Sequence, residues 1–91
     1  KQLIFYIIME KRKEVVMRSK IISILNEIFD NEDRIQVLDD NLKLSEQLDS
    51  MEIIELVVLL ENKLNIVISD ELLSNISQKT LDEFIRIIEQ L

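Results

Sequence analysis

Apolar residues recur at helical spacing along most of the chain. In the segment 14–29 they fall at i, i+3, i+4, i+7 and i+8, as Ile21, Ile24, Leu25, Ile28 and Phe29. This spacing puts all of them on one face, so it predicts an amphipathic helix over about 14–29. The polar run 30–33 is expected to end this helix, with Asn31 as its left-handed terminating residue.

A second helix is predicted from Asp49 or Ser50 to about Leu64, where Asn65 is a suitable stop. Asp and Ser are both favourable N-cap residues. Its apolar stripe consists of Ile53, Leu56, Val57, Leu60 and Leu64, and is widened by Ile54, Val58 and Leu59. A helix that is apolar over so much of its circumference either lies centrally or engages a partner.

Two further helix starts follow. Ser69 is the expected N-cap of a short helix over about 70–75, and Thr80 with Glu83 forms a capping box for a last helix over about 81–91. The chain contains no Gly and no Pro, which disfavours tight β-hairpins and Gly-rich phosphate loops. The predicted fold class is therefore all-α: a small four-helix bundle with three longer helices and one short helix.

The connection 30–49 is long and rich in acidic residues. Apolar residues recur through it, and we expect them to pin it to the bundle; they are Ile35, Val37, Leu38, Leu42, Leu44 and Leu48. The acids invite comparison with a calcium loop, but no Gly is present and Arg34 falls where an oxygen ligand would be needed. We expect no metal site.

The apolar run 3–9 is too short to cross a membrane, which takes about 20 residues as a helix. It also lacks the flanks of a signal peptide. We expect residues 1–14 to be an N-terminal extension, either natural or added upstream, that prolongs the first helix or docks on an apolar surface. The functional domain is expected to span 15–91.

Composition narrows the function. The absence of Cys excludes disulfides and thiolate metal sites and is consistent with a cytoplasmic protein. The absence of His removes the commonest general base, so we expect no enzyme activity. The net charge is −7, although six of the eleven Lys and Arg residues lie in the first twenty positions. The acidic remainder should repel nucleic acid and attract basic protein patches.

The tripeptide 49–51, Asp-Ser-Met, opens the most apolar helix after a long loop. Alone it is an ordinary helix cap. With the stretch 48–57, Leu-Asp-Ser-Met-Glu-Ile-Ile-Glu-Leu-Val, and with this order of helices, residues 15–91 resemble the acyl carrier protein family. In that family a Ser carries 4′-phosphopantetheine, derived from coenzyme A, through a phosphodiester.

The resemblance implies roles for particular residues. Ser50 would be the attachment site, and Asp49 the acid recognised by the phosphopantetheinyl transferase. Residues expected to face partner enzymes, with the acids exposed, are Met51, Glu52, Glu55, Val58 and Glu61. Residues expected to line or support an apolar interior that could shelter an acyl chain are Ile54, Val57, Leu60, Ile66, Ile68, Ile76 and Phe84.

The chain departs from fatty-acid carriers just before the serine. Many of these have Gly two or three residues earlier, where this chain has Leu48 and Gln47. The Leu-Asp-Ser-Met form is closer to D-alanyl and aminoacyl carriers or to carriers of specialised pathways. Fatty acyl, polyketide and aminoacyl cargo all stay open.

The expected function is a monomeric, non-catalytic carrier that holds an acyl or aminoacyl thioester. Its partners would be a transferase that installs the arm, a loading ligase, and downstream transferases or synthases with basic patches. A helix N-terminus suits the phosphate, because free N–H groups and the helix dipole favour an anion. The alternative is an acidic helical interaction module without a prosthetic group, which would bind partners through its apolar surfaces.

Overall fold

The computed structural model describes the backbone of residues 2–91 and the side chains of residues 16–91. The elements are α1 (Gln2–Asn31), α2 (Leu44–Gln47), α3 (Ser50–Leu64), α4 (Asp70–Asn75), a 3₁₀ turn η1 (Ile76–Gln78) and α5 (Leu81–Glu89). The predicted all-α bundle is confirmed, with α1, α3 and α5 as the longer helices and α4 as the short one. The single-turn helix α2 was not predicted, because four residues are too few to show a periodicity.

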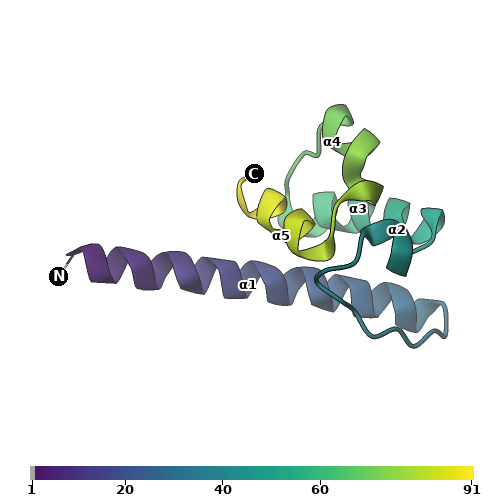
Figure 1. Ribbon diagram of the computed structural model, residues 1–91, viewed down its shortest axis with the longest axis horizontal. Helices are drawn as coiled ribbons and strands as arrows, with labels where there is room; N and C mark the ends of the chain where they lie inside the picture. The colour runs from purple at the N-terminus through teal and green to yellow at the C-terminus, as the bar shows by residue number, and fades with distance from the viewer. Residues whose placement is uncertain (1) are drawn as a thin grey trace.

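Helix α1 is 30 residues long, about twice the predicted length. Its N-terminal end projects past the other helices, while its C-terminal half packs against α3 and α5 (Figure 1). Of the two expected arrangements of the N-terminal extension, the backbone of residues 2–14 shows the first, since it continues α1. Within the described part of the chain, no helix is long and apolar enough to cross a membrane.

The core lies where α1, α3 and α5 meet. The apolar stripes of these helices supply its fully buried side chains, which include Ile21, Leu25, Ile28, Leu56, Leu60, Leu81, Phe84, Ile85 and Ile88. Burying one such side chain stabilises the fold by about 1.5–3 kcal/mol.

Most helix ends match the sequence-based expectation. Asp49 and Ser69 each accept an N–H bond as N-caps, and Asn65 ends α3 in the left-handed region at φ 53°. Thr80 and Glu83 exchange the two bonds of a capping box, and the Thr80 N–H and hydroxyl hold the pKa of Glu83 below its ordinary value.

The expected end of α1 is wrong by two residues. Asn31 stays helical, and the left-handed residue is Asp33, at φ 55°. The Asp33 N–H bonds to the Asp30 carbonyl at 3.1 Å and the Arg34 N–H bonds to the Phe29 carbonyl at 2.9 Å. This pair of bonds is the Schellman arrangement, and it satisfies the last carbonyls while it turns the chain toward α3.

The connection between α1 and α3 is only partly pinned by its apolar residues. Leu44 and Leu48 are buried and Leu38 packs on the core, as expected. For Ile35 and Val37 the expectation is wrong, because their side chains point to solvent. Leu42 is also exposed, at 39%. Polar contacts of Arg34 and Gln47, and not these three apolar side chains, hold the segment.

Candidate functional site

Ser50 is the first residue of α3, and both it and Asp49 are exposed. The Asp49 carboxylate accepts the Glu52 N–H at 2.8 Å. Among the described residues, the N–H groups of Ser50 and Met51 have no hydrogen-bond acceptor. An anion joined to the Ser50 hydroxyl would lie at the positive end of a 15-residue helix, beside free donors.

Glu52 does not belong to an exposed acidic face, and that expectation is wrong. Its side chain is fully buried. Its carboxylate accepts the Asp49 N–H at 2.9 Å, which completes a capping box, and it pairs with the Arg34 guanidinium. Burial opposes ionisation, but the Asp49 N–H and Arg34 outweigh it and leave the pKa of Glu52 below its ordinary value. Glu52 therefore holds the helix start in place.

Arg34 connects the loop to this helix start. It donates to both oxygens of Glu52, to the Gln36 side chain at 2.7 Å and to the Gln47 carbonyl at 2.7 Å. Its guanidinium also lies 4.9 Å from the centre of the Phe29 ring. One side chain thus joins the end of α1, the loop and the residues just before Ser50.

Gln47 occupies one of the positions where many fatty-acid carriers have Gly. Its amide is buried and bonds to loop backbone groups. The amide nitrogen donates to the carbonyls of Asp39 at 2.7 Å and Leu42 at 3.0 Å, and the amide oxygen accepts the Asp39 N–H at 2.8 Å. Gln47 thus fastens the middle of the loop three residues before Ser50.

Sequence reasoning missed the roles of Arg34 and Gln47. The available signals were a cation at the end of a run of acids and a polar side chain next to the apolar Leu48. Neither signal identifies the partner: Arg34 bonds to residues 13 and 18 positions away, and the Gln47 amide bonds to residues five and eight positions away.

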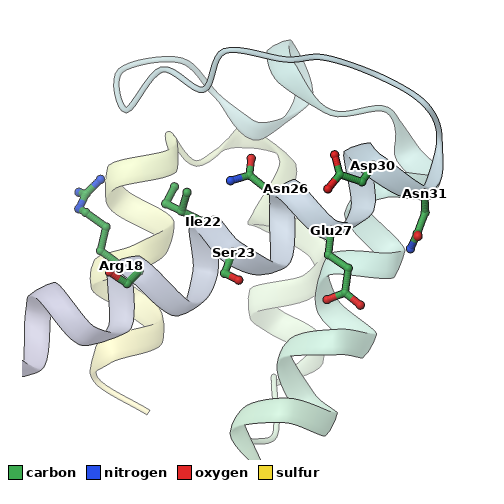
Figure 2. A pocket seen from close by; sticks show the side chains of 8 residues that line it. Arg18, Ile22, Ser23, Asn26, Glu27, Asp30 and Asn31 are labelled. Carbon is green, nitrogen blue, oxygen red and sulfur yellow. The ribbon is translucent and has the colours of Figure 1, made fainter.

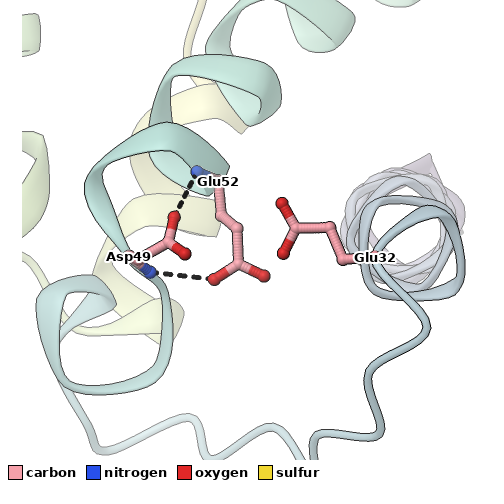
Figure 3. Close-up of side chains that lie close together, drawn as sticks. All are labelled: Glu32, Asp49 and Glu52. Carbon is pink, nitrogen blue, oxygen red and sulfur yellow. Dashed lines mark hydrogen bonds between the residues drawn. The ribbon is translucent and has the colours of Figure 1, made fainter.

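Glu32 faces Glu52 from the end of α1 (Figure 3). One oxygen each from Glu32, Asp49 and Glu52 lie within 4.8 Å of one another, near enough to share a cation. Both Glu52 oxygens, however, already accept hydrogen bonds from Arg34. The hydrogen bond to Glu52, partial desolvation and the nearby negative charges raise the pKa of Glu32.

Replacing Glu32 with Gln should raise the thermal unfolding temperature at pH 7. An acid whose pKa is raised in the folded state weakens the fold once it ionises, so the gain should be present at neutral pH. It should disappear as the pH falls below the ordinary Glu value, about 4.3. Thermal melts from pH 3.5 to 7 measure this.

Glu71→Gln is the matched control, since it removes the same charge from an exposed residue of α4. An equal rise in both variants would mean that only the net charge matters and that the Glu32–Glu52 contact does not.

The residues expected to face partners divide into two groups. Met51, Glu55 and Val58 lie on one face of α3, where Met51 is 60% and Val58 is 49% exposed and Glu55 is half-buried. Glu61 is half-buried, and its carboxylate accepts the Ile68 N–H at 3.1 Å, so it supports the loop after α3.

The expected interior set is mostly buried, with one error. Val57, Leu60, Ile68, Ile76 and Phe84 are buried, and Ile66 packs against the core. Ile54 is 56% exposed, because its position on α3 turns it away from α1 and α5. It lines an open apolar groove of about 320 Å³ between α3 and α4, formed by Ile53, Ile54, Val57, Val58, Leu73 and Ile76.

A larger hollow lies along α1 and shares no residue with this site. It has a volume of about 800 Å³ and is lined by mostly polar side chains of α1, from Arg18 to Asn31 (Figure 2). At one end Arg18 bonds to Asp40 at 2.8 Å and to Asp82 at 2.9 Å, and the Asp40 contact raises the pKa of Arg18. These two bonds tie the loop and α5 to α1.

Residues 19–88 match the family model described as the phosphopantetheine attachment site. No curated protein and no solved structure matches the chain. The matched range runs from the packed half of α1 to the end of α5 and includes Ser50. Since this range covers most of the chain, the protein belongs to the phosphopantetheine attachment family, the carrier proteins that hold 4′-phosphopantetheine as a covalent prosthetic group.

Proposed function

We propose that Ser50 is the residue that carries the 4′-phosphopantetheine arm. The observation that supports this most strongly is its position: an exposed Ser opens the 15-residue helix α3, inside the matched range. Arg34, Gln47 and Glu52 hold the backbone on both sides of it. A fixed and accessible hydroxyl at a helix N-terminus is what an attaching enzyme needs.

The attachment step forms one bond and breaks another. The Ser50 oxygen bonds to the phosphorus that carries pantetheine in coenzyme A, and the nucleotide portion leaves with the electron pair of the broken P–O bond. The hydroxyl proton is taken by a base that the transferase supplies, since the chain has no His to act as one. Ser50 is therefore a modified residue and not a catalytic nucleophile.

The arm then supplies the thiol that this chain lacks. An acyl or aminoacyl group is held on it as a thioester, which a loading ligase makes and downstream transferases or synthases consume. The α3–α4 groove offers an apolar wall to an aliphatic cargo. Because the groove is open and its wall includes the exposed Ile54, the cargo would lie on the surface and not in the core.

We propose that these enzymes recognise the exposed face of α3. Met51 and Val58 present apolar contacts on either side of Glu55, and the domain as a whole is acidic. Asp49 contributes its carboxylate next to the attachment point. Basic patches on the enzymes complement this surface and speed encounter. The buried Glu52 takes no part in these contacts.

The test is incubation of the purified chain with coenzyme A and a phosphopantetheinyl transferase. We expect the intact mass to increase by one arm only, and fragmentation to locate the arm within residues 48–53. An unchanged mass, measured beside a known carrier that is modified in the same tube, would refute the proposal. It would favour the interaction module without a prosthetic group.

A further inference from the structure

Two large apolar side chains stand almost completely in solvent on the loop before α2. Ile35 is 97% exposed and Val37 is 85% exposed, the two highest values among the large apolar side chains described. Their neighbours Arg34, Gln36 and Leu38 are half-buried. The segment is therefore extended, with alternate side chains turned inward and outward. Ile35 and Val37 together are called the loop face below.

The loop face is fixed in place. The Schellman turn and the Arg34 contacts hold its beginning, and the Gln36 amide donates to the Val37 carbonyl at 3.1 Å. Gln47 holds Asp39, just beyond it. Single exposed apolar residues are common on protein surfaces. Two on the same side of a fixed segment are different, because they can be buried by a partner with little loss of conformational entropy.

The loop face lies at the same end of the bundle as Ser50. Arg34, which directly precedes Ile35, contacts Glu52 in the first turn of α3 and the Gln47 carbonyl. An enzyme that reaches the Ser50 hydroxyl therefore approaches the loop face as well.

Charge decides what kind of partner fits. Carboxylates flank the loop face on both sides in the sequence, at Glu32, Asp33, Asp39 and Asp40, and of these Asp40 is paired with Arg18. The cation within the segment, Arg34, is neutralised by Glu52. A second copy of this acidic chain or an anionic lipid surface would be repelled. A protein with an apolar recess and basic side chains around it is complementary.

We propose that Ile35 and Val37 dock the phosphopantetheinyl transferase that modifies this chain, in addition to the contacts on α3. This inference rests on the proposed attachment at Ser50. The transferase buries both side chains in an apolar recess, and its basic rim pairs with the carboxylates that border the loop face.

The experiment measures kcat and KM for arm transfer from coenzyme A, with the transferase of the native source, on wild type and on the double variant Ile35→Ser/Val37→Ser. Loss of two buried apolar contacts should lower kcat/KM about tenfold, mainly through KM. Both side chains touch little of the protein itself, so thermal stability should change little. Asp33→Asn, which keeps a residue suited to the left-handed position, should raise KM about twofold and reduce its dependence on salt.

Val67→Ser is the matched control, since Val67 is 82% exposed on the loop between α3 and α4. Its KM should equal that of wild type. If the double variant also matches wild type, the loop face does not dock the transferase, and Ser50 attachment stands. If wild type itself gains no arm, it is the proposed function that fails. If wild type forms dimers and the double variant does not, a second copy of the chain occupies the loop face instead of the transferase.

Discussion

Ser50→Ala is expected to abolish attachment of the phosphopantetheine arm completely while the fold is retained. The substitution removes the oxygen that would form the phosphodiester, and nothing else in the site can replace it. Ser50 is exposed, and its side chain makes no hydrogen bond to another described residue, so the free energy of unfolding should stay within about 0.5 kcal/mol of wild type. Intact mass after incubation with transferase and coenzyme A gives the first result, and a thermal melt gives the second.

Ser45→Ala is the matched control for this prediction. Ser45 is also exposed, lies on α2 five residues earlier, and should leave modification at the wild-type level. Arm transfer to Ser50→Ala at any appreciable rate would show that another hydroxyl is the attachment site. Fragmentation of that product would then identify it.

Arg34→Ala is expected to cause the largest loss of stability among the polar substitutions at this site, about 2–4 kcal/mol. Its partner Glu52 is fully buried, so removal of the guanidinium leaves a carboxylate in the interior without its cation and with the Asp49 N–H as its backbone donor. The estimate stays below the top of the range for buried pairs because Arg34 itself is 31% exposed. Urea denaturation at pH 7 measures the change.

Two controls test this explanation. Lys63→Ala breaks the pair with Glu27, in which both side chains are nearly half exposed, and should cost less than about 1 kcal/mol. Glu52→Gln keeps an acceptor for the Asp49 N–H and leaves a guanidinium that can reach water, so it should cost less than Arg34→Ala. If Glu52→Gln costs more, the buried carboxylate is not the source of the effect.

The pH dependence of the Arg34 effect has a definite sign. The folded pKa of Glu52 lies below its ordinary value, so its contribution to stability is present above about pH 4.3 and is lost as the pH falls through the folded pKa. The Arg34→Ala variant lacks the stabilising contribution of the Arg34–Glu52 ion pair. Once Glu52 is protonated, wild type loses this contribution as well, because the neutral carboxyl group forms no ion pair. The stability difference between wild type and Arg34→Ala should therefore narrow below pH 4.3.

Local features of the fold could be predicted because they depend on neighbours in the sequence. The caps at Asp49, Ser69 and Thr80 each bond within a few residues along the chain, and the stop at Asn65 depends on that residue's own left-handed conformation. The end of α1 was misplaced because Asn31 and Asp33 have similar tendencies toward the left-handed region. In the structure Asp33 takes the left-handed conformation, and Arg34 directly after it reaches Glu52 on α3.

The sequence by itself determined the helical class, the four main helices, most of their caps and the serine at the head of the most apolar helix. These features follow from periodicity and from short-range hydrogen bonds. Only the tertiary structure decided that Glu52 is buried, that Arg34 and Gln47 fasten the loop before Ser50, and that Ile35 and Val37 face solvent. The physical reason is that burial and ion pairing depend on segments that are distant along the chain, and the pattern within one segment does not specify which partner it meets.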